Sequence, residues 1–149
     1  MLNIRPYHHS DQKELLEIFN FNVPKHFAPH EVAEFIGYLE IKSKTYLTIE
    51  FENKIIGGVG YEMRASDKSG RINWIFLHPD FSNKGYGKKA VEYCLAILKA
   101  DPAVDILIVR TYQLAYQFFE KLGYGLIKIE KDYWAPGFDL YLMEQIINK

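Results

Sequence analysis

The sequence has little cysteine and no long hydrophobic run, and each shortage excludes a class of protein. Cys94 is the single cysteine among 149 residues, which rules out an internal disulfide and a metal site built from several cysteines. It falls on the apolar face of a predicted helix, so we expect a buried thiol. No apolar run approaches the roughly 20 residues of a membrane span, and no signal-peptide core follows Met1. These absences predict a cytoplasmic protein that works without a membrane.

An excess of charge of either sign is also missing. Eighteen basic and nineteen acidic side chains leave a formal net charge of −1, whereas a general nucleic-acid binder is usually basic. Apolar residues make up 48% of the chain and aromatic residues 15%, which is enough material for a core. We therefore expect one domain over residues 1–149, with no nucleic acid among its partners.

The apolar pattern predicts strands and helices in the order β-α-α-β-β-β-α-β-α-β-β, a mixed sheet with helices. The predicted strands cover residues 2–6, 46–51, 55–63, 71–77, 105–109, 124–130 and 138–145. Four helices are predicted: after a cap at Ser10 or Asp11, from Pro29 through Leu39, from the glycine loop to about Ala100, and from Tyr112 to Leu122.

The most informative stretch is a glycine-containing loop that follows the predicted strand 71–77. It passes through Gly85 and Gly87 and leads into an amphipathic helix. The first N–H groups of a helix lack intrahelical partners and carry about half a positive charge. Glycine lets a phosphate approach these groups, and Lys84, Lys88 and Lys89 add positive charge. This loop therefore predicts a site for a phosphate-bearing ligand.

Two common phosphate-binding motifs fit this loop poorly. Gly85 to Ala90 matches the dinucleotide pattern G-x-G-x-x-G/A, but seven residues separate the loop's first glycine from the strand, and a hairpin precedes that strand. A Walker-type loop is excluded because Lys89 stands where Ser or Thr is required and Ser82 where the first glycine belongs. A plain helix entry explains the glycines but leaves the lysines unexplained.

Two segments carry a resemblance to a known family. Residues 82–87, SNKGYG, are similar to the pattern Q/R-x-x-G-x-G/A, and residues 115–124, AYQFFEKLGY, to A-x-x-x-Y-x-x-x-G-F. Together with the start Ile4-Arg5-Pro6 and the element order, they resemble the GNAT superfamily of N-acetyltransferases over essentially the whole chain. The resemblance implies an α/β fold of the GNAT-like acyl-CoA N-acyltransferase type. Its mostly antiparallel central sheet is splayed between strands 4 and 5 and flanked by about four helices.

The resemblance further implies acetyl-CoA as the acetyl donor. Backbone groups of Ile75, Phe76 and Leu77 would bind the pantetheine arm. An asparagine common in the family falls at Tyr112 or Gln113, and Tyr112 is the candidate for contact with the cofactor. Ser82 replaces the usual Gln or Arg, and it removes no amide because recognition in this loop is by the main chain. The residues that would bind the pyrophosphate are Asn83, Lys84, Gly85, Tyr86, Gly87 and Lys88.

The implied reaction is direct attack of a primary amine on the thioester, after an ammonium of pKa about 10 has lost its proton. The chain departs from the family here: Phe119 occupies the position of the usual proton-donating tyrosine, and Ile108 that of a glutamate base in related ribosomal-protein acetyltransferases. Tyr116, one helical turn before Phe119, is the candidate acid. Glu62 is the candidate base, acting through water. Packing of Tyr116 and simple exposure of Glu62 are the competing interpretations.

The acceptor implied by the resemblance is a small-molecule amine or a peptide N-terminus, and a homodimer is compatible with this fold. Tyr133, Trp134 and Tyr141 lie in the predicted final hairpin, where tyrosines of peptide N-terminal acetyltransferases contact the substrate; packing is the competing interpretation. Because the usual acid and base positions hold Phe119 and Ile108, which cannot transfer a proton, a non-catalytic acyl-CoA-binding module is the alternative function.

No metal is predicted. His26 and His30 have i, i+4 spacing, but Pro29 would disrupt a helix that carried both. No acidic ligand completes the pattern that a zinc site requires.

Overall fold

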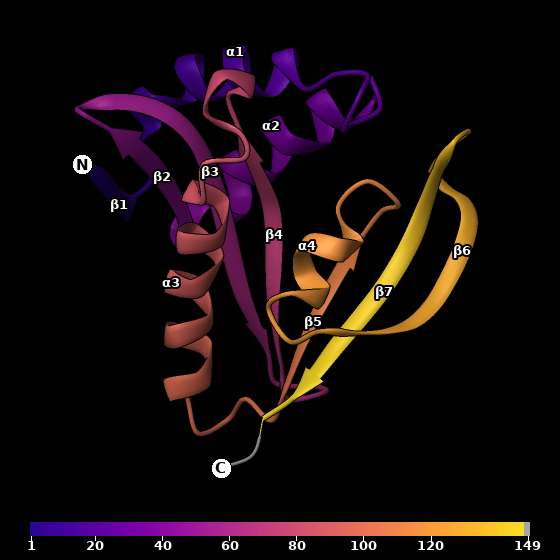
Figure 1. The fold of residues 1–149 in the computed structure, drawn as a ribbon. Coiled ribbons are helices and arrows are strands. Elements are labelled where there is room, and N and C mark those ends of the chain that lie inside the picture. Colours follow the sequence, from indigo (N-terminus) through magenta and orange to yellow (C-terminus); the bar gives the residue numbers. More distant parts are fainter. Residues whose placement is uncertain (148–149) are drawn as a thin grey trace. The chain divides into compact units, whose positions relative to one another are not determined.

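A computed structural model describes residues 1–147, and its ribbon is drawn in Figure 1. The predicted order of elements is confirmed. In chain order the elements are β1 (Leu2–Pro6), α1 (Gln12–Phe21), α2 (Glu31–Lys42), β2 (Tyr46–Phe51), β3 (Lys54–Arg64), β4 (Ser69–Leu77), α3 (Tyr86–Ala100), β5 (Ile106–Thr111), α4 (Tyr116–Glu120), β6 (Gly125–Ala135) and β7 (Phe138–Ile146).

The strands form one seven-stranded sheet in the order β1-β2-β3-β4-β5-β7-β6. β4 and β5 pair in parallel, from Ser69 opposite Ile106 to Ile72 opposite Val109. A parallel pair needs a long crossover, which α3 supplies. The pairs β1–β2, β2–β3, β5–β7 and β6–β7 are antiparallel. This confirms the predicted mixed α/β fold class.

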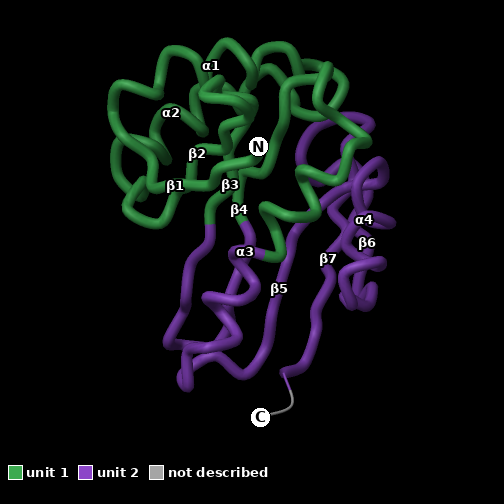
Figure 2. Tube along the Cα trace, turned by 60° about the vertical axis from the view of Figure 1, so that its left-hand side comes forward, with its two compact units in different colours: residues 1–60, 73–92 green, residues 61–72, 93–149 purple. Residues whose placement is uncertain are grey.

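Two compact units divide the chain, and Figure 2 colours them separately. Unit 1 consists of residues 1–60 and 73–92, and unit 2 of residues 61–72 and 93–149. The strands β3 and β4 and the helix α3 each contribute residues to both units. The expectation of a single domain over residues 1–149 stays a prediction.

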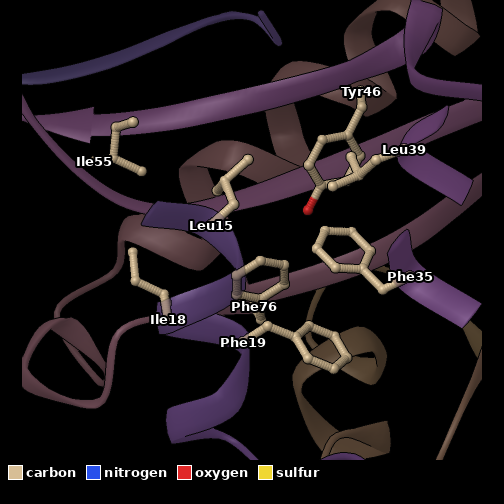
Figure 3. Packing of buried hydrophobic residues seen from close by; sticks show 8 residues of the cluster. All are labelled: Leu15, Ile18, Phe19, Phe35, Leu39, Tyr46, Ile55 and Phe76. Carbon is tan, nitrogen blue, oxygen red and sulfur yellow. The ribbon is translucent and has the colours of Figure 1, made fainter. Parts of the chain in front are cut away.

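Aromatic side chains dominate the core of unit 1. Phe19 on α1 is fully buried; its ring stacks on Phe35 of α2 at 4.9 Å and meets Phe76 of β4 edge-on at 5.3 Å. Figure 3 shows these three rings with Leu15, Ile18, Leu39, Tyr46 and Ile55 in one cluster. Burying each large side chain contributes about 1.5–3 kcal/mol. This packing holds β4 in unit 1 at the point where the glycine loop begins.

Asp11 lies at the N-cap of α1, as predicted, but its carboxylate does not cap that helix. It accepts a bidentate pair from Arg5 (2.8 and 2.9 Å), the N–H of His8 and the hydroxyl of Thr48. Burial acts to raise the pKa of Asp11, and these donors outweigh it and hold the pKa below its usual value. The carboxylate thus ties β1 and β2 to the start of α1.

Unit 2 contains β5, β7 and β6, together with the second half of α3. Cys94 is buried, as predicted, and burial raises the pKa of its thiol to about 12. The predicted helix 112–122 is wrong in length, because α4 covers only Tyr116–Glu120. Residues before it form a turn in which the Gln113 side chain is bonded to the β6–β7 hairpin. Gly123 caps the segment with a φ of +98°, as predicted.

None of the helices within residues 1–147 is long and apolar enough to cross a membrane. The same range holds no cluster of three or more His, Cys, Asp or Glu side chains with the spacing of a metal site.

Candidate active site

The second half of β4, in unit 1, has an irregular backbone. Trp74 adopts a φ of +48° within the strand, a conformation that is rare for a bulky side chain and typical of functional sites. The strand ends under tight control: the side-chain amide of Asn22 donates to the carbonyl of Leu77 at 3.0 Å, and the N–H of His78 donates to the carbonyl of Ile56 at 2.7 Å. These two hydrogen bonds therefore fix the direction in which the chain leaves β4 and enters the loop.

The main-chain groups of this strand face different sides. An ideal Cβ on Gly57 would lie 2.2 Å from the carbonyl oxygen of Phe76, so this oxygen faces β3. Because successive residues of a strand direct their N–H and C=O groups to opposite edges, those of Ile75 face away from β3. The ring of Phe76 lies in the core. Of the three predicted arm-binding residues, Ile75 and Leu77 thus turn their polar groups outward, and the carbonyl of Leu77 already accepts from Asn22.

The glycine loop is a sequence of small turns. His78 accepts the N–H of Asp80 at 3.0 Å, and the hydroxyl of Ser82 donates to the carbonyl of Pro79 at 2.8 Å. Asn83 (φ +59°) and Gly85 (φ +83°) are both left-handed. A Cβ on Gly85 would meet no atom within 4 Å, so glycine serves the backbone conformation there. Alternation of left- and right-handed residues turns successive N–H groups to one side, which makes an anion-binding concavity.

The loop opens directly into the N-terminus of α3. The N–H of Lys89 donates to the carbonyl of Gly85 at 3.1 Å, which closes the first helical turn. The amides of Tyr86, Gly87 and Lys88 precede this bond and belong to the helix end that carries positive charge. Lys84 and Lys88 are exposed. The loop and the helix end together can bind a phosphate mainly through the main chain.

An aromatic contact anchors the loop. The ring of Tyr86 lies 5.1 Å from Phe51 at the end of β2 and 6.4 Å from Phe81. The side chain of Tyr86 therefore packs the start of α3 against the end of β2, while its N–H remains part of the predicted phosphate site.

The predicted acid lies in unit 2. Tyr116 is half-buried, and its ring lies 4.6 Å from that of Tyr141 on β7. Phe119 is only 2% exposed and packs edge-on against Tyr124 at 5.6 Å. The two rings of α4 therefore have different neighbours: Phe119 belongs to the core, and Tyr116 keeps a partly exposed hydroxyl-bearing ring.

The turn before α4 is fastened to the β6–β7 hairpin by Gln113. Its amide nitrogen donates to the carbonyl of Gly137, and its amide oxygen accepts the N–H of Asp139 at 2.9 Å. Tyr112, the residue predicted to contact the cofactor, is half-buried with its ring 6.2 Å from Phe138. The tether was missed from the sequence, because the pairing of a glutamine with a hairpin 24 residues away has no local signal.

Arg110 makes a second tether to the hairpin. Its guanidinium donates to the hydroxyl of Tyr133 and lies 5.0 Å from the centre of that ring and 5.4 Å from that of Trp134. The indole N–H of Trp134 donates to the carbonyl of Thr111 at 3.1 Å. Tyr133 remains 43% exposed, so it is available to a ligand, whereas the indole N–H of Trp134 is used in the bond to Thr111.

Glu62, the predicted base, lies at the end of β3 in unit 2. Both of its carboxylate oxygens accept from Arg64, at 3.2 and 3.3 Å. The predicted site residues thus fall into two groups: Ile75–Leu77 and the loop residues 83–88 are brought together in unit 1, and Glu62, Tyr112 and Tyr116 belong to unit 2.

Comparisons with known proteins bear on the family and on the fold. The sequence model of the acetyltransferase (GNAT) family matches residues 12–124 of this chain. No curated protein matches the sequence. The fold is similar to the ribosomal-protein-S18-alanine N-acetyltransferase of Escherichia coli, with a TM-score of 0.81 at 16% identity, over 100% of this chain and 96% of that one.

Two further structures were solved with a ligand. One is yncA of Salmonella typhimurium with its cofactor acetyl-CoA, which has a TM-score of 0.77 at 12% identity, over 100% of this chain and 95% of that one. The other is N-acetylglutamate synthase of Neisseria gonorrhoeae with coenzyme A and N-acetyl-glutamate, with a TM-score of 0.77 at 13% identity; the match spans 100% of this chain and 36% of that one. At these identities the likeness shows the fold.

Proposed function

The chain belongs to the GNAT acetyltransferase family, and from that premise we propose that it transfers the acetyl group of acetyl-CoA to a primary amine by direct attack on the thioester. The acceptor is a small-molecule amine or a protein N-terminus. The observation that carries the proposal is the backbone of unit 1, in which Trp74 of β4 is left-handed and the left-handed Asn83 and Gly85 lead into the N-terminus of α3.

The residues of unit 1 fit the donor. The amides of residues 83–88 would bind the pyrophosphate, aided by the charges of Lys84 and Lys88. The outward C=O of Ile75, with the N–H of Leu77, would bind the amide groups of the pantetheine arm. Leu77 offers only its N–H, because its carbonyl already accepts from Asn22. A ligand rich in phosphate and amide groups matches a site that offers main-chain partners.

The reaction requires three further groups from the protein: a base, a hydrogen-bond donor to the thioester oxygen and a proton source for the thiolate. An ammonium acceptor must lose a proton before it attacks, and we assign this step to Glu62 through water. The charge that develops on the thioester oxygen needs a fixed donor, and we assign the N–H of Ile75. The departing thiolate takes up a proton, and we assign Tyr116 as its source.

A second function has one observation in its favour. The position of the usual proton-donating tyrosine holds Phe119, which is buried and unable to donate. A chain that binds acyl-CoA without transferring the acyl group would tolerate this residue. Positioning alone can supply several kcal/mol of the barrier, so we place the enzyme first.

A thiol-release assay separates the two functions. Acetyl-CoA is offered with a panel of polyamines, aminoglycosides, amino acids and short peptides, and calorimetry measures acetyl-CoA binding in parallel. Turnover on at least one amine, lost in Gly87→Glu, supports the enzyme. Tight binding without turnover on any acceptor supports the binding module. Absence of acetyl-CoA binding contradicts both.

A further inference from the structure

Tyr46, at the start of β2, makes a hydrogen bond across an intervening strand. Its side chain is fully buried, and its hydroxyl donates to the carbonyl of Trp74 on β4 at 2.8 Å. β3 lies between β2 and β4 in the sheet. Figure 3 shows the Tyr46 ring directed into the aromatic cluster, with the hydroxyl at its inner end.

Glycines on β3 make this reach possible. An ideal Cβ on Gly58 would lie 2.3 Å from the Tyr46 hydroxyl oxygen, and one on Gly60 would lie 2.4 Å from the Tyr38 hydroxyl oxygen and 2.9 Å from Cδ1 of Tyr46. Contacts this short do not occur between real atoms, so any larger residue would displace the ring. Glycine weakens a strand interior, and neither position has a left-handed φ. The passage of the Tyr46 ring accounts for Gly58, and the rings of Tyr38 and Tyr46 together account for Gly60.

The carbonyl that Tyr46 holds belongs to the left-handed residue of β4. A φ of +48° is unfavourable for a tryptophan, by about 1–2 kcal/mol, so the surrounding structure must hold it. The hydroxyl of Tyr46 is one such restraint. Trp74 would otherwise be free to relax toward the regular strand conformation.

The restraint acts on the next residue through the peptide bond. The Trp74–Ile75 peptide is planar and trans, so the N–H of Ile75 points opposite to the Trp74 carbonyl. That direction agrees with the outward orientation of Ile75 found from the Phe76 carbonyl. A donor on the carbonyl also polarises the N–H at the other end of the same peptide.

We propose that Tyr46 is a positioning residue for acetyl transfer: its hydroxyl orients and polarises the Trp74–Ile75 peptide so that the N–H of Ile75 donates to the thioester oxygen. This role rests on the proposed function. Tyr46 touches neither donor nor acceptor and acts through Ile75.

Tyr46→Phe tests the role with little disturbance, because phenylalanine keeps the ring that packs against Phe35 and Tyr38 at 5.6 Å each. Tyr124→Phe is the matched control. Tyr124 is also buried, and its hydroxyl finds no hydrogen-bond partner within residues 1–147. Each variant removes one buried hydroxyl, and only one of them holds a peptide of β4.

We expect kcat of Tyr46→Phe to fall about five- to tenfold, the effect of one weakened hydrogen bond in the transition state. The Kd for acetyl-CoA should stay within about twofold, and Tm should fall by about 2–4 °C. In ¹H–¹⁵N spectra the amide proton of Ile75 should move upfield. Tyr124→Phe should leave kcat and the Ile75 resonance unchanged.

Unchanged kcat in Tyr46→Phe overturns the proposal. So does a loss of kcat that is matched by equal losses in acetyl-CoA affinity, since that pattern reports a structural role. If the wild-type protein turns over no acceptor, the proposed function fails by itself. The Ile75 resonance then still decides whether Tyr46 polarises this peptide: an upfield shift supports it, and an unmoved resonance overturns it.

Discussion

In the proposed function, the strand–loop segment of unit 1 and the turn–helix segment of unit 2 would recognise their ligands by different means. From Trp74 to Lys88 the chain presents main-chain groups, held in place by Asn22, Tyr46 and the left-handed loop residues. From Tyr112 to Phe119 any function depends on the side chains themselves. We therefore expect the first segment to tolerate substitution at exposed positions, such as Ser82, and the second to be sensitive to a single change, such as Phe119.

The largest predicted effect breaks the main-chain site. Gly87→Glu places a carboxylate against the amides that would bind the pyrophosphate, and the repulsion of like charges at close range should weaken acetyl-CoA binding at least about a hundredfold. Calorimetry measures the loss. Gly37→Glu on α2 is the control, because a Cβ there meets nothing within 4 Å, and it should bind acetyl-CoA as the wild type does.

The next effect concerns a side chain of unit 2. If Tyr116 supplies the proton to the departing thiolate, Tyr116→Phe should lower kcat about a hundredfold, the usual contribution of a general acid, with little change in acetyl-CoA affinity. Steady-state kinetics and calorimetry give the two values. Undiminished turnover would remove Tyr116 from the mechanism and leave it as a packing partner of Tyr141.

A smaller effect is expected where the family tyrosine is restored. Phe119→Tyr puts a hydroxyl into the core beside Tyr124, where burial without a partner costs about 1–3 kcal/mol. Thermal unfolding should show a Tm lower by several degrees, with no gain in kcat. A rise in kcat at unchanged Tm would contradict the packing of Phe119 described for α4.

The smallest effect sharpens the contrast. Ser82→Gln introduces the side chain usual in the family, and because the loop would bind phosphate through its amides, the Kd for acetyl-CoA should change by less than about threefold. The only described contact that serine loses is its bond to the Pro79 carbonyl. A tenfold gain in affinity would show that side chains contribute more to this loop than the main-chain account allows.

Patterns local in the sequence predicted the secondary structure of the strand–loop segment well. The strand, the glycine loop and α3 follow from apolar periodicity and from the residues that favour a helix N-terminus, and the order of all elements followed likewise. The left-handed Trp74 had no such signal, because tryptophan does not favour that conformation. The cluster Gly57-Gly58-Val59-Gly60 was a usable signal for the passage of Tyr46, but its meaning depends on the pairing of β2 with β3.

The segment in unit 2 was predicted less well for a related reason. The helical periodicity of residues 112–122 predicted one continuous helix, whereas a turn precedes α4 in the structure. That turn is bonded through Gln113 to a hairpin distant in sequence. The pairing of β6 with β7 also shifts register between Glu130 and Ala135. Tethers of this kind depend on the three-dimensional path of the chain.

Mapping amide resonances during a titration with coenzyme A tests most directly whether the main chain of unit 1 binds the donor. In ¹H–¹⁵N spectra we predict that the largest shifts fall on residues 83–88 and on Ile75, and that Gly87→Glu abolishes them. Large shifts confined to other segments, with residues 83–88 unmoved at saturation, would contradict the assignment of the glycine loop as the phosphate site.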